Sequence, residues 1–79
     1  MWYVYLIASI DEDWSYVGFS NRLDERIQEH NAGKVQSTKA YAPFEMIAFV
    51  AVNSRQKARQ LEKYFKSGSG IAWMNRRLR

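Results

Sequence analysis

A chain of 79 residues with 47% hydrophobic and 15% aromatic side chains has the composition of one folded globular domain. It contains no cysteine, which excludes disulfide bridges and thiolate metal sites. No apolar run reaches the length of a membrane span and no signal peptide is visible, so we expect a cytoplasmic protein with no membrane partner.

The charge is distributed unevenly along the chain. Residues 1–52 carry four basic and seven acidic side chains, and residues 53–79 carry eight basic and one acidic. The two balances, −3 and +7, sum to the net charge of +4. A basic half of this kind is typical of a nucleic-acid binder, although a basic helix pair without a ligand would have the same composition.

The first elements predicted are two strands joined by an acidic turn. Residues 2–8 are continuously apolar, and residues 14–19 form a second run of strand-forming residues. If Ser9 lies opposite Trp14, then Tyr5 and Tyr16 share one face as diagonal neighbours, roughly 7–8 Å apart. A slip of one residue would place them on opposite faces. We predict the shared face.

An amphipathic helix follows the hairpin. Ser20 or Asn21 is expected to cap it, and residues 31–33 are expected to end it. Arg26 and His30 form an i,i+4 pair beside the apolar stripe of this helix. A cation therefore borders the side of the helix that should face the protein.

The rest of the chain alternates between loops and regular elements. We expect a loop over 33–43, a strand over 44–52, a helix over about 55–66 capped by Asn53 or Ser54, a break over 67–70 and a final helix. The order β-β-α-β-α-α predicts a single α/β (α+β) domain over 1–79, with a mainly antiparallel three-stranded sheet flanked by helices.

Glu62 departs from the pattern of its helix. It is the only carboxylate after Glu45, and it falls on the inward side of the helix. Burying a carboxylate costs several kcal/mol unless it is paired or binds a metal. A salt bridge to Arg26 is the structural interpretation, and a metal ligand is the functional one.

A single carboxylate suits Mg²⁺ (or Mn²⁺), which completes its shell with waters and substrate phosphates. Arg26 would then stabilise charge developing on a phosphodiester, and His30 or a tyrosine hydroxyl would handle protons. The basic side chains expected to contact nucleic acid are Lys34, Lys39, Arg55, Arg59, Lys63 and Arg76.

Two tripeptides and three later residues together resemble a known family. Tyr3-Val4-Tyr5 and Tyr16-Val17-Gly18, followed by Arg26, His30 and Glu62, are similar to the motifs of the GIY-YIG nuclease domain. The resemblance is to small stand-alone members related to the N-terminal domain of the bacterial excision-repair nuclease, and it covers essentially the whole chain.

The resemblance implies a role for each of these positions. Glu62 would be the metal ligand, Arg26 the phosphate-stabilising residue, Tyr5 and Tyr16 the active-site tyrosine pair, and His30 a support for proton transfer. Asn75 falls roughly where the repair nuclease has a polar residue near its metal site.

We therefore expect a metal-dependent phosphodiesterase acting on DNA, with RNA as an alternative substrate. Specificity would come from this domain, from a partner protein or from DNA structure. Two other hypotheses stay open: a non-catalytic nucleic-acid-binding module with the same fold, and an interaction domain in which the Arg26–Glu62 pair is only structural.

Overall fold

The computed structural model describes residues 1–78; Arg79, one of the eight basic residues counted in the second half, lies outside them. The elements are β1 (Trp2–Ser9), β2 (Ser15–Ser20), α1 (Leu23–Asn31), a 3₁₀ turn (Lys39–Tyr41), β3 (Phe44–Val52), α2 (Arg55–Lys66) and α3 (Gly68–Arg77). The predicted order β-β-α-β-α-α is confirmed.

The three strands form one antiparallel sheet in the order β2-β1-β3. In the β1–β2 hairpin, Tyr5 lies opposite Gly18 and Ile7 lies opposite Tyr16. The backbone N–H of Ser9 donates to the carbonyl of Trp14 at 2.8 Å, which closes the hairpin at the predicted register. Because side chains alternate between faces, Tyr5 and Tyr16 share one face of the sheet, as predicted.

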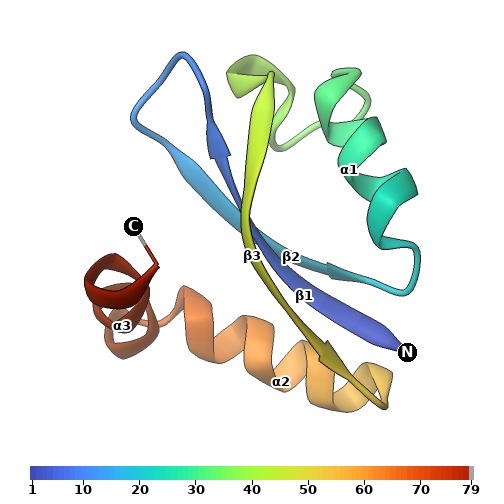
Figure 1. Ribbon diagram of the computed structural model, residues 1–79, viewed down its shortest axis with the longest axis vertical. Coiled ribbons are helices and arrows are strands. Elements are labelled where there is room, and N and C mark those ends of the chain that lie inside the picture. Colours follow the sequence, from blue (N-terminus) through green and yellow to red (C-terminus); the bar gives the residue numbers. More distant parts are fainter. Residues whose placement is uncertain (79) are drawn as a thin grey trace.

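Helices cover both faces of the sheet (Figure 1). Val4 and Leu6 of β1 pack with α2 and α3, where Ala58 and Met74 complete a core cluster. The alternate residues of β1, including Tyr5, pack on the other side with residues of α1. β1 is the central strand with both faces covered, which explains its continuous run of apolar residues.

The start of α1 differs from the prediction. Arg22, rather than Ser20 or Asn21, is the N-cap residue, and it makes no side-chain capping bond. β2 continues through Ser20, whose hydroxyl instead accepts the backbone N–H of Arg22 at 3.0 Å and fixes the turn from strand to helix. The predicted stop is confirmed, since Gly33 adopts a φ of +73° that favours glycine.

α3 begins earlier than predicted. The Ser54 hydroxyl caps α2 by accepting the Lys57 N–H at 3.1 Å, as expected. The expected break over 67–70, however, is reduced to Ser67. Its hydroxyl accepts the Gly70 N–H at 3.2 Å, so it caps a helix whose first turn contains both glycines.

Gly70 marks the close approach of α3 to α2. A Cβ atom added there would lie 2.7 Å from Cα of Phe65 and would overlap the carbonyl of Tyr64. We expect Gly70→Ala to lower the free energy of unfolding by about 1–3 kcal/mol, because the backbone cannot yield cheaply. Gly68→Ala is the matched control: nothing lies within 4 Å of its added Cβ. Thermal unfolding of both variants checks this, and equal melting temperatures would contradict it.

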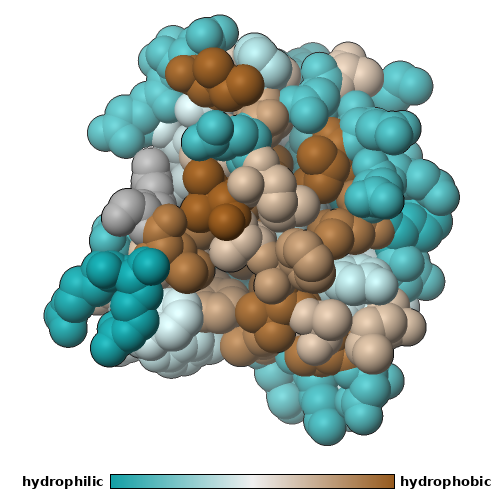
Figure 2. Space-filling model, viewed as in Figure 1, coloured by the Kyte–Doolittle hydropathy of each residue, from teal (hydrophilic) through white to brown (hydrophobic). Residues whose placement is uncertain are grey.

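Part of the exposed apolar surface lies along β3, one of the two edge strands. Figure 2 shows hydrophobic side chains gathered across the middle of this face, over β3. On β3, Phe49 is 53% exposed and Val50 is 41% exposed. The candidate site residues on the sheet belong instead to β1 and β2. Within residues 1–78, no helix is long and apolar enough to cross a membrane.

Candidate active site

The two tyrosines meet where β1 and β2 pair. Tyr5 is 2% exposed, whereas Tyr16 is half-buried. A Cβ atom at Gly18 would lie 2.6 Å from Cζ of Tyr5 and 3.0 Å from Cε2 of Tyr16. Only glycine therefore leaves room at this position for both rings in the places they occupy. The Tyr5 phenol thus lies directly against the backbone at Gly18.

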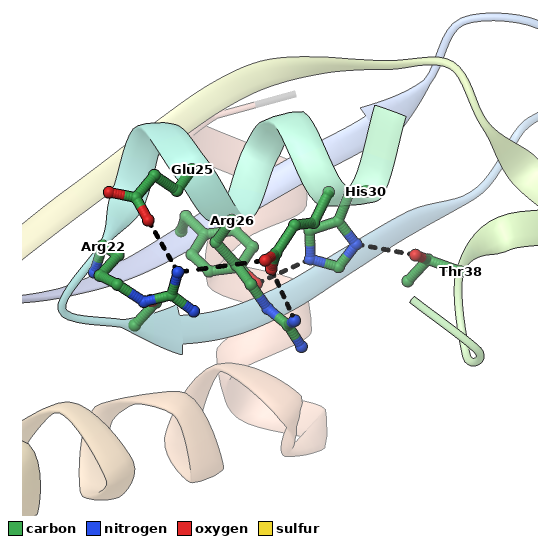
Figure 3. Close-up of polar contacts among 8 residues, drawn as sticks. Arg22, Glu25, Arg26, His30 and Thr38 are labelled. Atoms are coloured by element: carbon green, nitrogen blue, oxygen red, sulfur yellow. Dashed lines mark hydrogen bonds and ion pairs between the residues drawn. The ribbon is translucent and has the colours of Figure 1, made fainter. Parts of the chain in front are cut away.

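The imidazole of His30 lies within hydrogen-bond distance of the Tyr5 hydroxyl. Its imidazole is completely buried, with Nε2 2.8 Å from the Tyr5 hydroxyl and Nδ1 2.7 Å from Oγ1 of Thr38 (Figure 3). Thr38 is also completely buried, and it comes from the segment between α1 and β3. Both nitrogens of this buried ring are therefore within hydrogen-bond distance of a side-chain hydroxyl.

The environment fixes the protonation of this pair. Burial raises the pKa of Tyr5 to about 12; a hydrogen bond from Arg26 opposes this shift, and the charges of Tyr16 and Glu62 add to it. Burial, followed by the charge of Arg26, lowers the pKa of His30. At neutral pH Tyr5 is therefore protonated and His30 is neutral, so one ring nitrogen accepts a hydrogen bond and the other donates one.

The lowered pKa of His30 predicts an acid-sensitive fold. Below about pH 6.5 the unfolded histidine binds a proton that the folded one does not, so the free energy of unfolding decreases as the pH falls. The slope can reach about 1.4 kcal/mol per pH unit until the folded pKa is reached. The Glu29 carboxyl, whose pKa is lowered by its hydrogen bond from Arg26, titrates at more acid pH.

His30 is the only histidine of the chain, so a ¹⁵N NMR titration of its ring is unambiguous. It should titrate below pH 6.5, and chemical unfolding at pH 7.5 and 5.5 should show the loss of stability. Titration at or above pH 6.5 would contradict the assignment of a buried neutral ring.

Arg26 projects from the same side of α1 as His30 (Figure 3). Its Nη1 donates to Oε1 of Glu29 at 3.1 Å, and its side chain is 36% exposed. It is also close enough to Tyr5 for the two groups to perturb each other's protonation. The guanidinium therefore combines access to solvent with contact to the buried phenol.

The salt bridge predicted between Arg26 and Glu62 is not formed. Arg26 pairs with Glu29, and Glu62 pairs with Lys66 at 3.4 Å. The reason is local: each charge finds a partner one helical turn away on its own helix, at i,i+3 and i,i+4. The structural interpretation of Glu62 as the partner of Arg26 is therefore wrong.

Glu62 comes from the helix on the other face of the sheet from Tyr5. Its side chain is 18% exposed, and its charge is the smallest of the causes that shift the pKa of Tyr5. Within residues 1–78, no three His, Asp or Glu side chains cluster as a metal site. A lone carboxylate is a poor fit for Zn²⁺ or Ca²⁺, which take several protein ligands, but it fits Mg²⁺ or Mn²⁺ completed by waters and substrate oxygens.

The predicted nucleic-acid contacts are all exposed. Arg55, Arg59 and Lys63 lie on successive turns of α2, so they form one basic stripe. Arg55 also lies over the rings of Trp2 and Phe19, with centroid distances of 5.9 and 5.7 Å. The others are Lys34 and Lys39 after α1 and Arg76 in α3. Their contact with nucleic acid stays a prediction.

Comparison of the sequence with those of known proteins identifies the family of this chain. Residues 1–73 match the GIY-YIG catalytic domain. UPF0213 protein YazA of Bacillus subtilis is 35% identical over 65 residues, which cover 81% of this chain and 65% of that protein. UPF0213 protein HQ_3675A of Haloquadratum walsbyi is 32% identical over 66 residues, covering 82% of this chain and 73% of that protein.

UPF0213 protein CPE1444 of Clostridium perfringens is similar as well, with 33% identity over 65 residues, 81% of this chain and 69% of its own length. The match thus spans slightly less than two thirds of the Bacillus subtilis relative. No solved structure gave a significant match. The family match covers nearly the whole chain, including both tyrosine motifs, Arg26, His30 and Glu62. This chain therefore belongs to the GIY-YIG catalytic domain family.

Proposed function

We propose that this protein is a metal-dependent endonuclease that hydrolyses phosphodiester bonds of DNA. The arrangement around the two tyrosines supports the proposal: the Tyr5 hydroxyl lies 2.8 Å from Nε2 of His30, and the ring of Tyr16 lies 5.4 Å from the same imidazole. A hydrogen bond from Arg26 and the charge of Glu62 also act on the pKa of Tyr5. The two phenols, the guanidinium and the carboxylate come from four elements, β1, β2, α1 and α2. This set of groups is suited to phosphoryl transfer, which requires positioning and charge stabilisation more than covalent chemistry.

Glu62 is the residue that would hold the metal, and a bound Mg²⁺ or Mn²⁺ would supply positive charge at the scissile phosphate. Arg26 would bind a non-bridging phosphate oxygen and stabilise the charge that develops there. Its pairing with Glu29 leaves 36% of the side chain exposed, so the guanidinium is accessible to substrate.

The tyrosines would orient the attacking water. Tyr5 is fixed by His30, and Tyr16 is the more exposed of the two phenols. Since His30 is held neutral, its ring can accept a hydrogen bond from the Tyr5 hydroxyl, which leaves the phenol oxygen free to accept one from water or from Arg26. Hydrolysis then requires no covalent intermediate with the protein.

Cleavage of supercoiled plasmid in Mg²⁺ or Mn²⁺ tests the proposal. We expect nicked and then linear product with either ion, and none in EDTA, while single-stranded RNA of matched length reports on the alternative substrate. Salt-dependent binding without cleavage of any DNA would favour the non-catalytic module. Absence of both binding and cleavage would favour the interaction domain.

A further inference from the structure

Lys66 contacts two residues of the candidate site although no motif includes it. It lies one turn after Glu62 on α2, and its Nζ is 3.4 Å from Oε2 of that carboxylate. The same Nζ lies 5.0 Å from the centroid of the Tyr16 ring, within cation–π range. One ammonium group therefore bridges the proposed metal ligand and the more exposed phenol.

A surface depression opens beside this ammonium group. It has a volume of about 280 Å³ and lies between β2 and the two C-terminal helices. Its polar lining residues are Ser15, Tyr16, Lys66 and Asn75. Lys66 is the only cation among its lining residues within the described part of the chain. A phosphate in the depression would meet this positive charge next to Tyr16.

Fold stability does not account for the position of Lys66. Its side chain is 46% exposed, and an exposed i,i+4 ion pair contributes only about 0.3–0.5 kcal/mol. A lysine needed only for solubility would be equally useful on the outer face of α2, where Lys57 and Lys63 are exposed. The contacts of Lys66 point toward the site instead.

We propose that Lys66 is a substrate-binding residue that contacts a phosphate flanking the scissile bond, in the depression beside Tyr16. This inference rests on the proposed nuclease function. Without a divalent cation the ammonium neutralises Glu62. If Glu62 held a divalent cation instead, Lys66 would be free to contact the phosphate of a bound nucleic acid.

Binding of a fluorescein-labelled DNA duplex to Glu62→Gln protein tests this without any cleavage. Adding Lys66→Met to that background should weaken binding roughly five- to tenfold at 0.1 M salt and lower the slope of log K against log salt by about one. Lys57→Met removes the same charge from the same helix, away from the depression, and should have a much smaller effect. Lys66→Arg should retain binding, which separates lost charge from lost structure.

A second readout uses the metal alone. Lys66→Met in the otherwise wild-type chain should bind Mn²⁺ about threefold more tightly, measured by water proton relaxation, because the competing ammonium is gone.

Equal DNA affinity and salt slope for the Lys66→Met and Lys57→Met proteins would overturn the proposal. If wild type cleaves DNA and this happens, only the role of Lys66 fails. If wild type neither binds nor cleaves DNA, the proposed function fails with it.

Discussion

Glu62→Gln should reduce DNA cleavage about 10³-fold or more while leaving DNA binding intact. The substitution keeps the shape of the side chain but removes the negative charge that would hold Mg²⁺, and loss of such charge stabilisation is worth several kcal/mol of activation free energy. Within residues 1–78 the only ion pair of Glu62 is with Lys66, which is 46% exposed, so the fold should lose less than about 1 kcal/mol. Single-turnover cleavage and thermal unfolding measure the two effects.

Glu45→Gln is the matched control. It removes one carboxylate from an exposed position at the start of β3 and should leave cleavage unchanged. If Glu62→Gln instead unfolds the protein, then Glu62 has a structural role after all. If it cleaves as fast as wild type, Glu62 does not hold the metal.

Arg26→Ala should slow cleavage roughly 10²–10³-fold, the range found when one charge-stabilising donor is removed from an active site. Among the described residues, Arg26 is the cation whose hydrogen bond and charge act on the Tyr5 hydroxyl. DNA affinity should fall only by the contribution of about one phosphate contact. Cleavage rates at saturating protein separate the two effects.

Arg22→Ala tests whether the loss is specific. Arg22 lies at the N-terminal end of α1 and also pairs with a glutamate, Glu25, at 2.8 Å, but its side chain is 52% exposed. We expect a change of less than about threefold, since surface ion pairs of this kind contribute little. Equal losses for the two variants would mean that Arg26 acts through general charge and not at the site.

The strand register was the structural feature most directly readable from the sequence. A shift of one residue in the pairing of β1 and β2 would place Tyr5 and Tyr16 on opposite faces of the sheet, because it turns every side chain of one strand over. The helices were also predictable in number and order, since their apolar stripes and the Ser54 cap are local signals. These features depend on near neighbours in the chain.

Helix ends were predicted less well. Ser20, Ser67 and the glycines that follow it have several conformations open to them, and the tertiary structure selects among these. Gly70 lies inside α3 because only a glycine permits α3 to begin against the Tyr64 carbonyl. From the sequence alone, residues 67–70 are expected to be a break between two helices.

Some partners of the charged and polar site residues were also predictable from the sequence, and others were not. The pairing of Lys66 with Glu62 could have been predicted from the sequence, since the two residues are four positions apart on one helix. The sequence pattern predicted a pair between Glu62 and Arg26 instead. The contact of Thr38 with His30 could not be predicted from the sequence, because it depends on the path of the segment between α1 and β3. No spacing rule relates a loop hydroxyl to a helical imidazole.

The central claim is that Glu62, Arg26 and the tyrosines form one metal-dependent site. Titration of isotope-labelled protein with Mn²⁺, followed by paramagnetic broadening of NMR signals, tests it most directly. We predict that the side-chain signals of Glu62, Tyr16 and Arg26 broaden first, and that Glu62→Gln abolishes this broadening. Broadening centred on the acidic turn at residues 11–13, with sharp signals at Glu62 and Tyr16, would contradict the account.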